Sequence, residues 1–474
     1  MASLSLTGLP DEKVHVPDST LSALAADLDG TLLSPEDDGY ADSVALWNGM
    51  ITKRPALVAR AGSTADAARA VTFAAEHGVE LSIRGGGHNI AGLALCDGGL
   101  TLDMSALRDV EVDRDAGLVR VAPGCTLGDV DRATQEHGLA TTLGFVSGTG
   151  VAGLTVGGGF GYLSRRFGWT VDDLEEVEIV TADGAVRRAS RSVEPELFWA
   201  IRGGGGNFGV VTEFTYRLHP VGPQMTGGII AWPASEAERV LDRFREATAS
   251  APLELTLVAL RRNAPPAPWL PESAHGTPII AIVACHTGEL DQAAADLEPI
   301  TSLGEPLANI IQANDYTAQQ SMLDATQPKG MHYYWKSEFV SELSDGLLSA
   351  YHEQFVDLKA PANQSVLFHM AGALNEHPED DGAVGNREAA FACVVQAMSP
   401  PDSPAADANR TWVRNAWQAI KPFSTGGNYV NFQTDDEPDE RTVESYRSNY
   451  ERLQAAKATY DPTNVFRVNR NIRS

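Results

Sequence analysis

The chain has 474 residues, of which 43% are hydrophobic, so it can bury the cores of roughly two or three domains. Its formal net charge of -27, from 63 acidic and 36 basic residues, predicts repulsion from nucleic acid and from anionic membranes. An apolar run of about 18 residues, which a membrane-spanning helix requires, does not occur.

Residues 1–39 contain a phosphatase-like motif. Asp27-Leu28-Asp29-Gly30-Thr31 resembles the nucleophile motif of haloacid-dehalogenase-type phosphatases, in which the first aspartate attacks phosphorus. That chemistry requires a buried strand ending at the first aspartate, whereas residues 19–26 have the pattern of a capped helix. We therefore expect a helix end and a glycine turn here. A phosphohydrolase that uses Asp27 and Asp29 is the first alternative function.

Strand and helix patterns alternate from Pro55 to Leu218. A helix capped at Ser63 is expected to run to about His77. The expected strands are 56–59, 81–84, 99–103, 109–113, 118–122, 176–182 and 210–218. Their short spacing predicts an α+β nucleotide-binding domain, and Pro220 and Pro223 mark its end.

Three glycine-rich segments interrupt these elements. The first, Arg84-Gly85-Gly86-Gly87-His88-Asn89, directly follows a strand, and the others span 144–162 and 202–211. Glycines at a strand end let the backbone approach a bulky ligand, and their N–H groups can point at phosphate oxygens. A histidine held there, His88, would lie against that ligand.

The remainder of the chain has a different pattern. Between residues 223 and 420, apolar strand-like runs at 227–232, 253–260, 279–285 and 364–371 alternate with expected helices near 235–249, 290–302 and 384–398. Residues 421–474 contain an amphipathic helix that is expected over 444–460 and is stopped by Asp461-Pro462.

The three glycine-rich segments and residues 460–472, in this order, resemble the FAD-linked oxidases of the vanillyl-alcohol oxidase superfamily. The most similar branch is the berberine-bridge-enzyme-like branch. The resemblance implies an α+β fold with a two-part PCMH-type FAD-binding domain, 40–222 completed by 421–474. An antiparallel-sheet substrate domain backed by helices, 223–420, would roof the flavin. The implied reaction moves a hydride from an alcohol, sugar or amine carbon to flavin N5, and O2 or another acceptor then reoxidises the flavin.

The resemblance also implies how FAD is held. His88 matches the histidine that the family links to the flavin 8α-methyl carbon, and a neutral imidazole is a competent nucleophile. Val146 stands where many relatives carry a second linking cysteine, so we expect covalent attachment through His88 only. Thr149 matches the position that tunes oxygen access. The expected FAD site consists of Arg84, Gly85, Gly86, Gly87, His88, Asn89, Gly92, Gly148, Thr149, Gly150, Gly153, Gly158, Gly161, Tyr162, Gly209, Val211, Tyr429, Asn431 and Asn469.

The tyrosine that often acts as the family's catalytic base is missing. The C-terminal motif reads Tyr429-Val430-Asn431-Phe432, and Phe432, at the position of the usual base, cannot take a proton. The remaining candidates for the base are Tyr429, Tyr334, Lys336 and His369, of which Tyr334 and Lys336 would share one face of a strand. A non-catalytic flavoprotein that has lost its base is the second alternative function.

Composition also bears on the compartment. Dense acid is tolerable where salt screens it, which is typical of proteins from salt-loving organisms. Cys96, Cys125, Cys285 and Cys393 show no metal or pairing spacing, and residues 1–7 lack the pattern of a signal peptide. We expect a cytoplasmic protein that binds a small-molecule substrate and no metal ion, nucleic acid or membrane.

Overall fold

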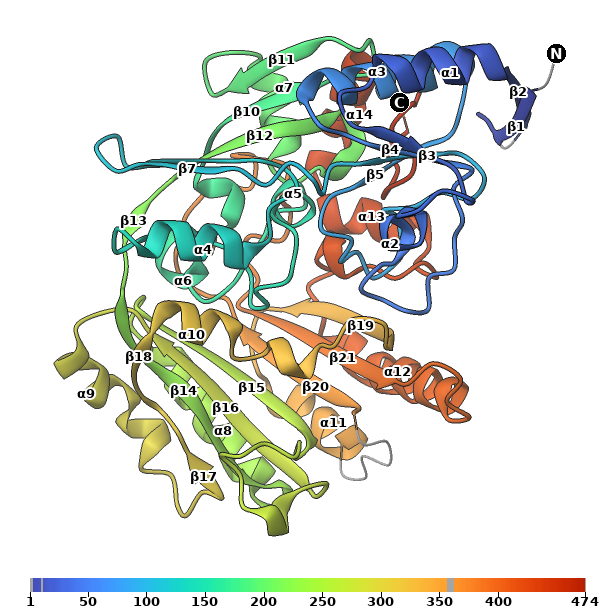
Figure 1. Ribbon diagram of the computed structural model, residues 1–474. Coiled ribbons are helices and arrows are strands. Elements are labelled where there is room, and N and C mark those ends of the chain that lie inside the picture. The colour runs from blue at the N-terminus through green and yellow to red at the C-terminus, as the bar shows by residue number, and fades with distance from the viewer. Residues whose placement is uncertain (1–2, 10–11, 356–361, 474) are drawn as a thin grey trace.

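The computed structural model describes residues 3–9, 12–355 and 362–473, which form an upper and a lower part in the view of Figure 1. The upper part contains two sheets from the N-terminal half of the chain, and the lower part is built on one large sheet. Helices α13 (Asp439–Tyr446) and α14 (Asn449–Tyr460) come late in the chain but pack into the core of the upper part.

The first sheet of the upper part has four short strands. Their order is β3 (Thr31–Leu33), β4 (Leu57–Arg60), β6 (Leu100–Asp103) and β5 (Leu81–Arg84). β4, β6 and β5 are parallel, whereas β3 pairs antiparallel with β4. Helix α3 (Thr64–His77) begins where the Ser63 side chain accepts the N–H of Asp66, and it ends at Gly78 in the left-handed region.

The second sheet is antiparallel and supports the glycine-rich segments. Its order is β11 (Val186–Ser190), β10 (Leu174–Val180), β12 (Val210–Arg217), β8 (Leu118–Val121) and β7 (Val110–Asp113). The helices around it are α4 (Leu127–Gln135), α5 (Val151–Val156), α6 (Ser164–Phe167) and α7 (Pro195–Ile201). A short pair, β9 (Leu139–Ala140) with β13 (His219–Pro220), precedes the crossing to the lower part.

The lower part consists of an antiparallel sheet of eight strands. The order is β17 (Ala308–Asn309), β14 (Gln224–Pro233), β16 (Pro278–His286), β15 (Leu255–Asn263), β20 (Gln364–His369), β21 (Phe391–Ser399) and β19 (His332–Val340), and β18 (Gln312–Asp315) also pairs with β14. One face packs on α8 (Ala237–Ser250), α9 (Leu290–Thr301), α11 (Asp345–Phe355) and α12 (Ala406–Ile420). The opposite face is turned to the upper part, with α10 (Tyr316–Ser321) near its edge.

The N-terminal elements rest on the upper part. β1 (Ser3–Thr7) pairs with β2 (Lys13–Pro17), followed by α1 (Asp18–Asp27), and α2 (Tyr40–Val44) comes after β3. Asp27 is the last residue of α1, so no strand leads to it. The next turn is held by the Asp66 carboxylate, which accepts the N–H groups of Asp29 and Gly30, both at 2.9 Å. The expected helix end and glycine turn are confirmed.

Two expected helices are wrong. Residues 384–398 contain strand β21 instead of a helix, because Phe391, Cys393 and Val395 pack toward the helices while Val394 faces the other side. Both faces of this strand are covered, so its apolar run lacks the alternation that marks a strand.

The expected single helix over 444–460 is two helices, α13 and α14. They are separated at Arg447, whose φ of 51° lies in the left-handed region. The Arg447 side chain pairs with Glu388 and donates to the Thr425 carbonyl oxygen at 2.8 Å. These tertiary contacts, which are distant in sequence, support the break.

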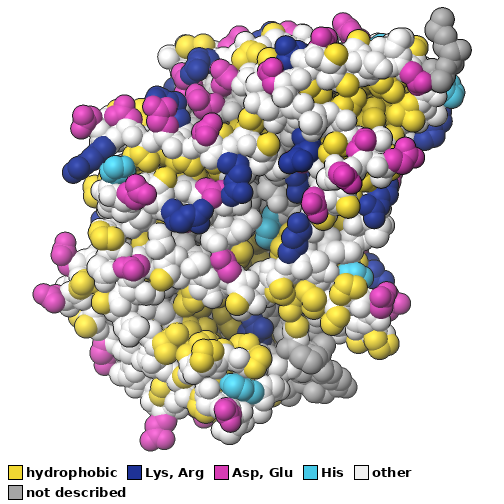
Figure 2. Space-filling view, in the orientation of Figure 1, with side chains coloured by type: hydrophobic (Ala, Val, Ile, Leu, Met, Phe, Trp, Pro, Cys, Tyr) yellow, Lys and Arg dark blue, Asp and Glu magenta, His cyan; other side chains and the backbone are white. Residues whose placement is uncertain are grey.

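The exposed charge and the state of the cysteines are as the composition predicts. Figure 2 shows acidic side chains over both parts of the visible face. All four cysteines are buried and form no disulfide. In the ranges that the structure describes, no helix has the length and apolar character needed to cross a membrane.

Candidate active site

A cavity lies where the glycine-rich segments meet the open face of the eight-stranded sheet. We call its two sides the glycine wall and the sheet wall. The glycine wall consists of lining residues from the segments 85–89, 149–154, 205–211 and 468–470. The sheet wall consists of Val258, Leu260, Arg262, Trp335, Gln364, Val366, Phe368, Val394 and Gln396.

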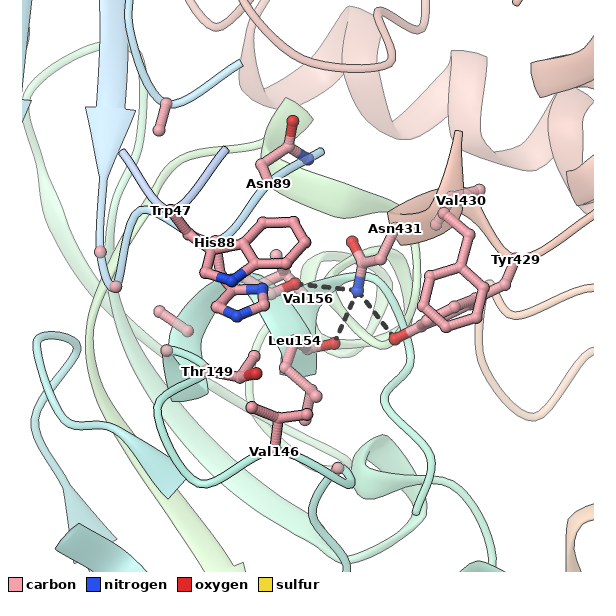
Figure 3. A pocket seen from close by; sticks show the side chains of 18 of the residues that line it. Trp47, His88, Asn89, Val146, Thr149, Leu154, Val156, Tyr429, Val430 and Asn431 are labelled. Carbon is pink, nitrogen blue, oxygen red and sulfur yellow. Dashed lines mark hydrogen bonds between the residues drawn. The ribbon is translucent and has the colours of Figure 1, made fainter. Parts of the chain in front are cut away.

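His88 lines the cavity and is held by aromatic stacking. The Trp47 ring stacks on the His88 ring with 4.3 Å between centroids (Figure 3). It also stacks on the Tyr333 ring, with 3.8 Å between centroids. Trp47 is fixed in turn, because its Nε1 donates to the Gln327 carbonyl oxygen at 3.0 Å. Burial lowers the pKa of His88 to about 4, so its imidazole is neutral near pH 7 and keeps a lone pair on one ring nitrogen.

Gly86 and Gly150 bring two loops of the glycine wall into contact. A methyl group at Gly86 would lie 2.4 Å from the Gly150 Cα, and one at Gly150 would lie 2.5 Å from the Gly86 nitrogen. Among the described residues, no protein acceptor bonds the N–H groups of Gly85, Gly86 and Gly87. Three successive free N–H groups form a site suited to an anion such as a diphosphate.

Tyr429 and Asn431 close one end of the cavity. The Asn431 side-chain nitrogen lies 2.8 Å from the Tyr429 hydroxyl and 3.1 Å from the carbonyl oxygens of Gly153 and Leu154 (Figure 3). The Tyr429 hydroxyl also accepts the N–H of Gly159 at 3.0 Å. Burial raises the pKa of Tyr429 far above its ordinary value, so this phenol stays protonated and positions Asn431.

The sheet wall is organised in rows that cross four neighbouring strands. In one row Arg262 lies opposite Gln364, Gln364 opposite Gln396, and Gln396 opposite Trp335. Gln364 Nε2 donates to Gln396 Oε1 at 3.0 Å, and Gln396 Nε2 donates to Gln327 Oε1 at 3.2 Å. The neighbouring row is apolar and contains Leu260, Val366 and Val394.

The C-terminal segment completes the glycine wall. A fully buried pair, Lys457 and Asp461 at 2.6 Å, anchors it, because Lys457 Nζ also donates to the carbonyl oxygens of Asn207 and Phe466. Asn469 lines the cavity, and its Nδ2 donates to the Gly206 carbonyl oxygen at 3.1 Å. Its buried Oδ1 has no partner within the described chain, and a ligand hydroxyl in the cavity could supply one.

The structure brings most of the expected FAD residues together. Those that line the cavity are Gly85, Gly86, Gly87, His88, Asn89, Thr149, Gly150, Gly153, Gly209, Val211, Tyr429, Asn431 and Asn469. Those that lie outside its lining are Arg84, Gly92, Gly148, Gly158, Gly161 and Tyr162. Arg84 supports the wall from behind through Asp103 at 2.8 Å, and Gly161 is packed so tightly that a methyl group would lie 1.9 Å from the Leu143 carbonyl oxygen.

Three candidates for the base lie away from the cavity. Tyr334 and Lys336 point into the helix side of the sheet, where both bond the Asp436 carboxylate, at 2.7 and 2.6 Å. His369 follows the lining residue Phe368 on β20 and stacks instead on Phe391, at 5.4 Å. Burial, aided by the charge of Arg165, lowers the pKa of His369 to about 2. None of the three side chains lines the cavity.

Several lining residues were not anticipated from the sequence. Trp335 is on β19, the same strand as Tyr334 and Lys336, but its side chain is on the opposite face. The alternation of side chains along a strand could have indicated this. Trp47 lies in no glycine-rich motif and has no comparable signal. Arg262 and Gln364 lie near the ends of apolar strands, and Gln396 interrupts the apolar run of β21; such polar residues could have indicated a cavity on this face of the sheet.

Two family models match this chain, and each covers one part of the glycine wall. The model described as FAD binding domain matches residues 55–190, which include the His88 loop and the Gly150 loop. The model described as berberine and berberine like matches residues 428–473, which include Tyr429, Asn431 and Asn469. Over these two segments the chain is similar to the berberine-bridge-enzyme-like FAD-linked oxidoreductases.

Full-length relatives agree with this assignment. An FAD-linked oxidoreductase of Dictyostelium discoideum is 29% identical over 94% of this chain and 95% of its own length. (R)-6-hydroxynicotine oxidase of Paenarthrobacter nicotinovorans is 28% identical, over 96% of this chain and 99% of its own. The crystal structure of 6-hydroxy-D-nicotine oxidase from Arthrobacter nicotinovorans superposes with a TM-score of 0.81 at 27% identity, covering 94% of this chain and 98% of that one. The protein is an FAD-dependent oxidoreductase.

The residues of the cavity fit FAD. The free N–H groups of Gly85, Gly86 and Gly87 suit its diphosphate, and the unpartnered Asn469 Oδ1 suits a hydroxyl of its ribityl chain. A methyl group at Gly153 would meet no atom within 4 Å, so open space for a ligand lies directly beside the backbone there.

Proposed function

We propose that this enzyme holds FAD through one covalent bond to His88 and oxidises a small molecule at a carbon bonded to a neutral amine nitrogen. FAD supplies the hydride acceptor when it is bound. Molecular oxygen is the proposed final acceptor. The observation that carries the choice of an amine is that, among the described residues, the sheet wall presents no proton-accepting side chain to the cavity.

His88 supports the covalent bond by its position and by its protonation state. Its imidazole lines the cavity from the glycine wall and is stacked on Trp47, and its low pKa keeps a nitrogen lone pair available. Val146 also lines the cavity and brings no sulfur, and none of the four cysteines of the chain contributes to the described lining. This set of side chains supports one bond through His88 without a second bond.

The lining argues against an alcohol as substrate. An alcohol must lose its hydroxyl proton, which a base within hydrogen-bond reach normally takes. The described lining contains no aspartate, glutamate or lysine. Phe432 has no ionisable group, and the raised pKa of Tyr429 disfavours the phenolate that could accept a proton. Loss of hydride from a neutral amine leaves an iminium ion and requires no such base.

The sheet wall suits a compact apolar substrate. Val258, Val366 and Phe368 offer aliphatic and aromatic surface, and Phe145 packs on Phe368 at 4.8 Å between ring centroids. These side chains exclude water and hold a substrate against the glycine wall by burial of apolar area. The relative named (R)-6-hydroxynicotine oxidase, whose named substrate contains an amine nitrogen, supports the same choice.

The test is anaerobic bleaching of the flavin with matched amines and alcohols. Benzylamine and N-methylbenzylamine above their own pKa should reduce the flavin, and benzyl alcohol should not. Phe432→Tyr restores a phenol at the position of the usual base, so it should increase reduction by the alcohol and leave reduction by the amines within about threefold of the wild type. Reduction by alcohols alone in the wild-type protein would overturn the proposal.

A further inference from the structure

The row that carries Arg262 contains the one charged side chain of the sheet wall. Arg262 ends an alternating series on β15, after Val258 and Leu260, so all three point to the cavity. Its side chain is partly buried, and its Nε donates to the carbonyl oxygen of Asn263 at 3.2 Å. Within the described ranges, no carboxylate pairs with this guanidinium.

Several other buried arginines of the chain have partners, whereas Arg261, which is fully buried and near Tyr351 outside the cavity lining, keeps two side-chain nitrogens without a hydrogen bond in the described chain. Arg84 pairs with Asp103 at 2.8 Å, and Arg387 pairs with Asp172 at 2.8 Å. Arg165 has no carboxylate partner but donates to the backbone carbonyl oxygens of Ala251, Pro252 and Ala371. Arg262 has one carbonyl partner, and desolvation alone lowers its pKa. A cation in this position is costly unless an anion reaches it.

The other polar residues of this row bond to one another and not to the Arg262 guanidinium. Gln364, Gln396 and Gln327 bond one another in series, at 3.0 and 3.2 Å, so much of their hydrogen-bonding capacity is used within the row. The amides are neutral and balance no charge. The apolar row of Leu260, Val366 and Val394 begins two residues away along the strands, where it can hold a hydrophobic body attached to the anion.

We propose that Arg262 binds a carboxylate on the substrate, so that this enzyme prefers aromatic or aliphatic amines that carry a carboxylate at the far end from the reacting carbon. The inference rests on the proposed function only in placing the substrate in this cavity. A carboxylate fits better than a phosphate, because one guanidinium balances a single negative charge and its planar fork matches two carboxylate oxygens. The overall charge of -27 repels anions from the surface, so an anion that binds must meet a specific cation.

Binding is tested on the holoenzyme by calorimetry with benzoate and benzamide, which share a shape and differ in charge. The wild type should bind benzoate about 10- to 100-fold more tightly than benzamide, the range expected for a charge-assisted hydrogen-bonded pair. Arg262→Gln should abolish that difference, and Arg262→Lys should keep part of it because it retains the charge but not the fork. Arg243→Gln, which makes the same change of charge at an exposed residue of α8, is the matched control and should bind as the wild type does.

A second readout compares flavin reduction by 4-carboxybenzylamine and by benzylamine. The wild type should favour the carboxylated amine in kcat/KM, and Arg262→Gln should lose the preference. Equal binding of benzoate and benzamide to the wild type, or undiminished benzoate binding by Arg262→Gln with normal FAD content, would overturn the proposal. If neither amine reduces the flavin, the proposed function fails, while calorimetry still decides the role of Arg262.

Discussion

Replacing Gly86 by alanine tests whether the two loops of the glycine wall must touch. The new methyl group would lie 2.4 Å from the Gly150 Cα, and ordinary contact begins at 3.4 Å, so the loops must separate by about 1 Å. The two atoms that the methyl group would meet, the Cα and the nitrogen of Gly150, belong to the backbone and cannot rotate away. We expect a loss of stability of about 1–3 kcal/mol, as for other overpacked positions.

The melting temperature reports this change weakly. Unfolding entropy of about 2.1 cal/mol/K per residue makes the expected decrease only ~1–3 °C for a chain of 474 residues. Flavin attachment is the more sensitive assay, because a displacement of about 1 Å at reacting groups can cost about 100-fold in rate. Apoprotein incubated with FAD should therefore gain acid-stable flavin about 100-fold more slowly in Gly86→Ala than in the wild type.

Gly148→Ala is the matched control for Gly86→Ala. Gly148 belongs to the loop that contains Gly150, but a methyl group there would meet no atom within 4 Å. Its stability should stay within about 0.5 kcal/mol of the wild type, with normal flavin attachment. Wild-type rates and stability in Gly86→Ala would refute the argument that this contact shapes the FAD site.

Three further predictions concern charge. The melting temperature should rise between low and molar KCl, because screening relieves the repulsion of a net charge of -27, and a flat or falling curve would contradict the salt-adapted interpretation. Lys336→Met should lower stability by about 1–3 kcal/mol in denaturant titrations, since it removes the buried cation shared by Asp436 and Glu437 and leaves them only their pairs with Arg414 and Arg441, yet the rate of flavin reduction should be unchanged. The folded pKa of His88, about 4, is below the ordinary value of 6.5, so the unfolded chain binds the proton more tightly. The stability of the apoprotein should therefore fall as pH decreases from 6.5 toward 4, whereas flavin attachment by the folded apoprotein should stay nearly constant down to about pH 5 and slow as pH passes through 4. An attachment rate that rises on acidification would contradict a neutral His88.

The sequence predicts the upper part of the molecule better than the lower part. Strands β4 to β8 and helix α3 carry local signals, such as the Ser63 cap and the terminal Gly78, that tertiary packing does not override. Strand β21 was not predicted because both of its faces are covered, so its sequence lacks the alternation of apolar and polar residues that marks a strand. The break between α13 and α14 at Arg447 could not be predicted, because the residues that support it, Glu388 and Thr425, are distant in sequence.

One wall of the candidate site can likewise be predicted from the sequence better than the other. Its glycine wall is predictable, since His88 and Gly85–Gly87 lie in one motif whose backbone freedom has a clear use. The sheet wall depends on which face of a strand is turned to the cavity, and the pattern of β19 alone allows either face. Tyr334 and Lys336 share a face as expected, but that face meets the helices, and Trp335 lines the cavity.

The most direct test of the account is the location of the flavin after denaturation. Wild-type protein precipitated in acid should stay yellow, and after proteolysis the peptide that contains His88 should carry the mass of the flavin. His88→Ala should release its flavin into the supernatant. If all of the flavin leaves the wild-type protein in acid, or if its mass is found on a peptide without His88, the covalent site at His88 is wrong.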